Sequence, residues 1–100
     1  MANEESKPSY KKIPDLNQMF KFLRNRYQTK FGCRSSDVAK AIDERPQCVS
    51  SWSTGYNDRK PPLRLIVWLT ANSETEIRIN SEGVSAFDLS GNKLIDFDVE

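Results

Sequence analysis

The spacing of the apolar residues changes near residue 72, and this change limits the class of fold that the chain can adopt. Before that point, apolar residues recur every three or four positions, which is typical of one face of an α-helix. The clearest run is Leu16, Met19, Phe20, Leu23, Tyr27 and Phe31. After it, Ile77 and Ile79 alternate with polar residues, as in a β-strand. One hundred residues make one average domain, so we predict a single core built from helices followed by strands.

Start and stop signals divide the first part of the chain into four helices. Gly32 and Gly55 are suited to helix ends because glycine readily adopts the left-handed conformation found there. Pro46 suits the first turn of a helix, where its missing N–H costs nothing. Ser35 or Ser36 is expected to cap the second helix. These signals predict helices over residues 15–31, 35–44, 46–54 and 63–71.

Two helices carry further expectations. Lys21, Arg24, Arg26 and Lys30 lie opposite the apolar face of the first helix, where we expect solvent. The fourth helix is apolar almost all round, so we expect it at the centre of the core.

The last part of the chain is predicted to form short strands. Residues 94–99 are rich in strand formers, and Ser90-Gly91-Asn92 before them is a tight-turn signal. We therefore divide the chain into a polar arm (1–13), a helical unit (14–72) and a hairpin or meander of strands (73–100).

Positive and negative charges are segregated along the sequence. From Lys7 to Arg64 there are thirteen Lys and Arg against five Asp and Glu, whereas Leu65 to Glu100 has two against seven. A basic segment of this kind is typical of a nucleic-acid-binding surface. It is equally compatible with a solvated helical surface.

Several function classes are disfavoured by what the sequence lacks. The chain has no histidine, and Cys33 and Cys48 lack metal-site spacing, so we expect no zinc site, no Ser/His/Asp arrangement, no cofactor and no enzyme. Asp96 and Asp98 share one strand face, which we interpret as a solvated edge rather than a metal site. No apolar run reaches 18 residues and no apolar leader begins the chain, so we expect a cytoplasmic protein with no membrane partner.

Residues 35–55 contain the most specific pattern. Two helices joined by about three residues need a small residue where they cross and apolar residues that hold the crossing angle. Ala39, Ile42, Val49 and Trp52 occupy these positions. The segment therefore looks like a helix-turn-helix.

This segment resembles the DNA-binding domains of the lambda-repressor-like superfamily, in particular the phage CI and Cro repressors. The resemblance covers about residues 16–71 and is most specific in Val49-Ser50-Ser51-Trp52 followed by Gly55. Asp43 and Glu44 stand where the family usually has glycine and an apolar residue, and Pro46 is unusual at its position. Asp43 is permissible because aspartate tolerates the left-handed conformation. The resemblance implies a mainly α, four-helix lambda-repressor-like domain with a short C-terminal β hairpin or meander (α+β).

The resemblance also implies site residues on double-stranded DNA. The third helix would enter the major groove, with base edges read by Arg45, Gln47, Ser50 and Ser51. Phosphates would be contacted by Arg34, Ser35, Ser36, Lys40, Asn57, Arg59 and Lys60. A basic arm would contribute Lys7, Lys11 and Lys12. For each residue alone, simple solvent exposure is the competing interpretation.

One helix-turn-helix reads only a few base pairs, so we expect a homodimer. Residues 73–100 are the candidate dimerisation segment, unless they only cover the core of their own chain. We predict a phage or prophage type of transcriptional regulator, in a bacterial or phage-infected cell, with no small-molecule ligand. The alternatives are an antitoxin with the same DNA-binding unit and an adaptor that binds protein.

Overall fold

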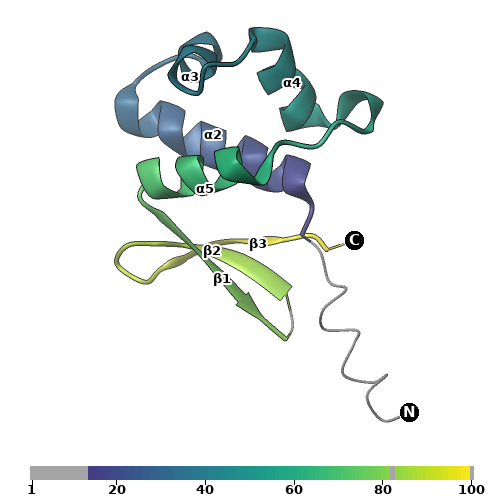
Figure 1. The fold of residues 1–100 in the computed structure, drawn as a ribbon. Helices are drawn as coiled ribbons and strands as arrows, with labels where there is room; N and C mark the ends of the chain where they lie inside the picture. Colours follow the sequence, from purple (N-terminus) through teal and green to yellow (C-terminus); the bar gives the residue numbers. More distant parts are fainter. Residues whose placement is uncertain (1–13, 82, 100) are drawn as a thin grey trace, which may run out of the picture.

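The computed structural model describes residues 14–81 and 83–99, and Figure 1 shows their arrangement. This part of the chain is an α+β fold of four α-helices, one short 3₁₀-helix and three strands, in the order that the apolar spacing predicts. The elements are α2 (Leu16–Phe31), α3 (Ser35–Ala41), α4 (Pro46–Thr54), η1 (Tyr56–Asp58), α5 (Leu63–Asn72), β1 (Thr75–Asn80), β2 (Gly83–Asp88) and β3 (Lys93–Phe97). The predicted arm, with Lys7, Lys11 and Lys12, lies outside the described residues.

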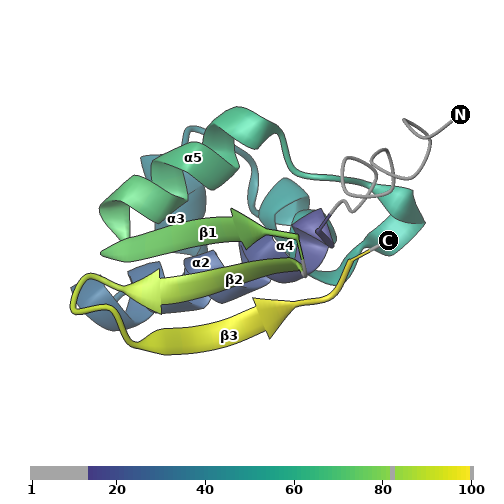
Figure 2. The same cartoon turned by 90° about the horizontal axis from the view of Figure 1, so that it is seen from below.

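The elements are stacked in three layers. In Figure 1, α3 and α4 lie above α2 and α5, and the sheet lies below them. Figure 2 views the sheet from below, with the helices behind it. One cluster of buried residues runs through all the layers, from Val38 and Val49 through Phe20 and Leu23 to Val84, Ala86 and Phe97. The inner face of the sheet therefore completes the core of its own chain, as one of the two interpretations of residues 73–100 requires.

Helices α2 and α4 end where the sequence predicts. Asp15 caps α2 by accepting the backbone N–H groups of Asn17 and Gln18 at 3.0 and 3.1 Å. Gly32 and Gly55 follow the two helices with φ angles of 60° and 77°, in the left-handed region that favours glycine.

Helix α3 differs from the prediction at both ends. Its N-cap residue is Arg34, whose backbone N–H is bound by the carboxylate of Asp37 at 2.9 Å, so the predicted cap at Ser35 or Ser36 is wrong. The helix ends at Ala41 and not near Glu44. The cause of the early end is Asp43, whose φ of 58° is incompatible with a continuing right-handed helix.

The prediction that α5 lies at the centre of the core is also wrong. Its residues Leu65, Ile66 and Leu69 are buried, but Leu63 and Val67 are 66% and 67% exposed. The main contacts of helix α5 are with α2 and β1, and Arg64 at its start also pairs with Glu44 of the turn after α3. One side of an apolar helix is thus left uncovered.

The sheet is an antiparallel meander in the order β1-β2-β3. Val84 and Ala86 of β2 point into the core, opposite Ile79 and Ile77 of β1. The turn between β2 and β3 is held by Asp88, whose Oδ1 accepts the backbone N–H groups of Ser90 and Asn92 at 2.9 Å each. The bonds from Asn92 are the main reason why the pKa of Asp88 is lowered.

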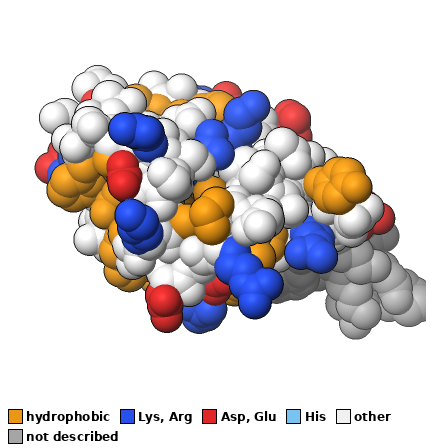
Figure 3. All heavy atoms as spheres, turned by 90° about the horizontal axis from the view of Figure 1, so that it is seen from above, with side chains coloured by type: hydrophobic (Ala, Val, Ile, Leu, Met, Phe, Trp, Pro, Cys, Tyr) orange, Lys and Arg blue, Asp and Glu red, His pale blue; other side chains and the backbone are white. Residues whose placement is uncertain are grey.

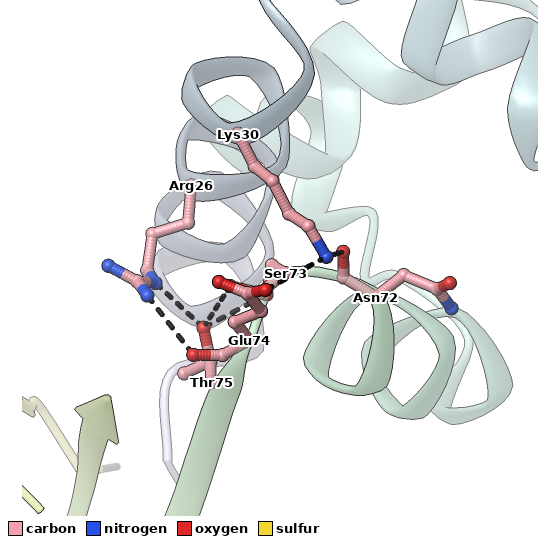
Figure 4. Close-up of polar contacts among 6 residues, drawn as sticks. All are labelled: Arg26, Lys30, Asn72, Ser73, Glu74 and Thr75. Carbon is pink, nitrogen blue, oxygen red and sulfur yellow. Dashed lines mark hydrogen bonds and ion pairs between the residues drawn. The ribbon is translucent and has the colours of Figure 1, made fainter. Parts of the chain in front are cut away.

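Basic side chains of α2 fix the start of β1 (Figure 4). Arg26 donates from Nε to Thr75 Oγ1 at 2.7 Å and from Nη2 to the Glu74 carbonyl at 3.1 Å. Lys30 Nζ bonds the Asn72 carbonyl at 3.4 Å and pairs with the Glu74 carboxylate at 3.5 Å. Lys21 is exposed, as expected for a solvated face. Arg26 and Lys30 instead bond residues 72–75, where α5 ends and β1 begins.

We predict that Thr75→Val destabilises the protein by about 1–3 kcal/mol, the usual cost of leaving buried polar groups without partners. The substitution keeps the side-chain shape but removes the hydroxyl that binds Arg26 and the Ser73 side chain. Urea unfolding measures the change. Thr29→Val, the same exchange at an exposed position of α2, should change the unfolding free energy by less than about 0.5 kcal/mol. Equal effects of the two variants would contradict the conclusion that the Thr75 hydroxyl stabilises the start of β1.

Candidate nucleic-acid interface

The turn between α3 and α4 consists of residues 42–45. After α3, Asp43 adopts the left-handed conformation, and the backbone N–H of Glu44 returns to the Ala39 carbonyl at 2.8 Å. Pro46 then occupies the first turn of α4. The four residues expected to hold the crossing are all buried: Ala39, Ile42, Val49 and Trp52. Glu44 stands at the position where an apolar side chain was expected, and its carboxylate pairs with Arg64 at 3.3 Å.

The predicted base-reading residues gather on the outer side of α4. Gln47 and Ser50 are exposed and Ser51 is partly buried, at positions three and four apart that share one face. Arg45 is exposed immediately before the helix. Thr54 extends this face by one turn and donates its hydroxyl to the Ser50 carbonyl at 3.1 Å. We did not single out Thr54 in the sequence, although its spacing from Gln47, Ser50 and Ser51 was a sufficient signal.

The predicted phosphate contacts fall into three groups around α4. Arg34, Ser35 and Ser36 lie at the start of α3, where Arg34 and Ser36 are exposed and Ser35 is partly buried. Lys40 lies with Arg45 around an open hollow of about 460 Å³ at the turn. Asn57, Arg59 and Lys60 are exposed in the segment after α4. Asp37, Asp43 and Glu44 lie between these cations, so the surface is mixed in charge.

The segment after α4 contains two consecutive residues with left-handed backbone conformations. Asn57 and Asp58, two and three residues after Gly55, both have left-handed φ angles, of 57° and 56°. Asn57 therefore resembles Asp43 as a non-glycine residue in a conformation that short polar side chains tolerate best. This backbone directs the chain from the end of α4 back to α2.

A buried amide that the sequence analysis missed holds this segment. Asn17 is 8% exposed, and its Nδ2 donates to the carbonyls of Trp52 at 2.8 Å and Arg59 at 2.7 Å. Its Oδ1 accepts a hydrogen bond from Lys60 Nζ at 3.1 Å. The Trp52 carbonyl is one of the last four of α4, which have no helical N–H partner. Asn17 thus binds the end of α4, the following segment and a predicted phosphate-binding lysine at once.

Arg24 joins α2 to α4 from the inside. Its Nη1 donates to Ser53 Oγ at 3.0 Å, and Ser53 Oγ donates to the Val49 carbonyl at 2.8 Å. Burial lowers the pKa of Arg24. The expectation that Arg24 lies on a solvated face is therefore wrong, because its guanidinium supports the inner side of α4.

Figure 3 shows the molecule from the side of α3 and α4. Lys and Arg side chains are spread over this face, with acidic side chains between them. Three of the seven acidic residues after position 65, Glu76, Asp88 and Asp96, lie in the strands, in the opposite layer, together with Arg78 and Lys93.

Other kinds of site find little support in the described residues. No group of three or more His, Cys, Asp or Glu in this part of the chain is placed to hold a metal ion. Cys33 and Cys48 are free thiols. No helix in residues 14–81 and 83–99 is long and apolar enough to cross a membrane.

Comparisons with protein-family models, with curated proteins and with solved structures found no match to this chain.

We predict that Asp43→Gly stabilises the protein by up to about 1 kcal/mol. A left-handed non-glycine residue costs about 1–2 kcal/mol, which exceeds the entropic cost of about 0.5–1 kcal/mol that glycine adds. Thermal or urea unfolding measures the gain. Ala41→Gly, two residues earlier and within α3, should instead destabilise by about 1 kcal/mol. A loss of stability in both variants would contradict the conformation described for Asp43.

We predict that Asn17→Ala lowers the unfolding free energy by about 1–3 kcal/mol, because two carbonyls lose their donor. Amide hydrogen exchange should show faster exchange in residues 52–60 than in α3. Asn25→Ala removes an exposed amide from the same helix and should leave both measurements close to those of the parent protein. Unchanged exchange in residues 52–60 would show that Asn17 does not hold this segment.

Proposed function

We propose that this protein binds double-stranded DNA sequence-specifically through α4, and that it acts as a transcriptional regulator of the phage or prophage repressor type. The observation that carries the proposal is the exposed polar face of α4, placed after a left-handed turn in a helix-turn-helix. We assign the fold to the lambda-repressor-like type on the same basis.

The chemistry of the α4 face supports base reading. Gln47 has an amide that pairs bidentately with adenine, and the hydroxyls of Ser50 and Ser51 donate or accept at several bases. Gln47 and Ser50 are exposed near the start of α4, the end that helix-turn-helix proteins direct at base edges. Pro46 gives this end of the helix a fixed φ and no N–H donor of its own. Arg45, exposed beside it, is suited to a guanine edge or to a phosphate.

The surroundings of α4 support phosphate binding on two sides. Arg34, Ser35 and Ser36 precede α4 in the helix-turn-helix, and Arg59 and Lys60 follow it. Phosphate contacts position a protein on DNA without reading sequence. The Asn17 amide fixes the second group relative to α4, since it binds the Arg59 carbonyl and the Lys60 side chain together with Trp52.

Fluorescence anisotropy of the full chain, with a random duplex and with DNA flanking its own gene, tests the proposal at about 50 and 200 mM salt. We expect tight binding to the flanking DNA, and loss of the random duplex at the higher salt. Gln47→Ala and Ser51→Ala should relax the preference between the duplexes. Arg59→Ala should weaken binding to both and reduce the salt slope by about one unit.

Lys93→Ala is the matched control for Arg59→Ala. It removes one exposed positive charge from β3, in the layer opposite α4, and should leave DNA binding unchanged. No binding to either duplex at the lower salt would reject the proposed function. Equal losses from Lys93→Ala and Arg59→Ala would reject the assignment of the α4 side as the binding face.

A further inference from the structure

A hollow of about 440 Å³ lies between α2 and the chain that leads into the sheet, and we call it the α2–β1 pocket. One face of α2 lines it with Phe22, Asn25, Arg26, Thr29 and Lys30, and residues 73–74 line the other side. Its volume is near the lower end of the range for small-molecule sites. None of the residues proposed to contact DNA lines it.

Arg26 is a fixed cation in the wall of this pocket. Its Nε and Nη2 donate to Thr75 Oγ1 at 2.7 Å and to the Glu74 carbonyl at 3.1 Å (Figure 4). A guanidinium has five N–H groups in a planar fork. Nη1 of Arg26 makes no hydrogen bond within residues 14–81 and 83–99. One end of a guanidinium that is already held in place is therefore available to an acceptor.

Lys30 is a second cation, one helical turn further along α2, and it is held more loosely. Its Nζ is 3.4 Å from the Asn72 carbonyl and 3.5 Å from the Glu74 carboxylate. Charge-assisted hydrogen bonds are shorter, at about 2.7–2.9 Å. The ammonium group can therefore turn toward a ligand without breaking a short bond.

Glu74 supplies a carboxylate to the same pocket from an unusual backbone conformation. Its φ angle of 55° is in the left-handed region, which glutamate rarely adopts and glycine adopts without strain. Its side chain is 60% exposed, so core packing does not explain a glutamate at this position. Within the described residues, the carboxylate has one ion pair, the long one with Lys30. Strained residues of this kind cluster at ligand sites.

The charges around the pocket indicate the class of ligand. Arg26 and Lys30 attract an anionic group, and Glu74 attracts a cationic group. Asp88 also lies close enough to Arg26 for their charges to interact, so these four groups together are neutral. A phosphate would be attracted by the two cations but repelled by the two carboxylates. A ligand that carries one carboxylate and one ammonium group is complementary to both kinds of charge.

The remaining lining is suited to an apolar substituent. Phe22 is partly buried and packs edge-on against Phe97, with ring centroids 5.7 Å apart. The stems of Arg26 and Lys30 are aliphatic, and most of the lining surface is apolar. The pocket thus combines a few charged groups with an apolar wall, as small-molecule sites do.

We propose that the α2–β1 pocket binds a free α-amino acid with an apolar side chain. The carboxylate of the ligand binds Arg26 and Lys30, its ammonium group binds Glu74, and its side chain packs against Phe22. A peptide fits less well, because its two terminal charges are separated by the length of its chain. This site goes beyond the proposed function and does not depend on DNA binding.

A chemical-shift titration of the ¹⁵N-labelled full chain with L-phenylalanine, in the absence of DNA, tests the proposal. We expect saturable shifts in residues 22–30 and 73–75 with a dissociation constant of about 1 mM, the affinity of a ligand of about ten heavy atoms in an open pocket. 3-Phenylpropanoate lacks the ammonium group, 2-phenylethylamine lacks the carboxylate, and L-alanine lacks the ring. Each of them should bind about tenfold more weakly or worse, and inorganic phosphate should not compete.

Variants test the assigned contacts. Glu74→Gln and Lys30→Gln each remove one charge from the pocket and should each weaken binding of phenylalanine by about tenfold. Glu76→Gln and Lys21→Gln are the matched controls, because they remove exposed charges from β1 and α2 outside the pocket, and binding should not change. Thr29→Trp, at an exposed position of the lining, fills the pocket and should abolish binding. Circular dichroism of each variant confirms that it is folded.

The absence of saturable shifts in residues 22–30 and 73–75 at about 10 mM phenylalanine would overturn the proposal. Binding of 3-phenylpropanoate or phosphate as tightly as phenylalanine would overturn the class of ligand. Equal losses in the pocket variants and their matched controls would overturn the assignment to this pocket. Because no DNA is present, a failure of DNA binding would reject the proposed function and leave this result standing.

Discussion

The position of the candidate DNA-binding helix depends on the side-chain amide of Asn17. Both N–H groups and the oxygen of this amide are used, and its partners lie 35 to 43 residues away along the chain. One of these bonds satisfies an end carbonyl of α4 that the helix itself leaves without a partner. Because a buried amide is costly unless its bonds are made, displacing α4 or the segment to Lys60 from α2 would leave buried polar groups without partners.

Helix α2 connects the layer of α4 to the sheet. On one side, Phe20 packs edge-on against Trp52 of α4, with ring centroids 5.7 Å apart, and Arg24 bonds Ser53. On the other side, Phe22 packs against Phe97 of β3 at the same centroid distance, and Arg26 bonds Thr75 of β1. The α4 face and the sheet are therefore fixed to the same helix, so their relative position depends on the packing of α2.

The order and class of the elements were predictable because they depend on local signals. Apolar spacing and the helix-ending glycines place α2 and α4, and the tolerance of aspartate for positive φ accounts for Asp43. The bonds of Asn17, Arg24 and Arg26 were not predictable, since each joins residues at least 29 positions apart and leaves no periodic pattern. The exposed side of α5 was missed for a related reason. The composition of α5 shows that the helix is apolar, but how many of its faces are buried depends on how many other elements pack against it.

The segregation of charge along the sequence is explained by the layers of the fold. The strands, with three of the seven acidic residues after position 65, lie in the layer opposite α3 and α4, with α2 and α5 between them. A polyanion at α4 would therefore be separated from these acids by a helical layer. The net charge of +1 thus hides an uneven distribution, because the predominantly basic first part of the sequence builds the helices and the predominantly acidic last part builds the sheet.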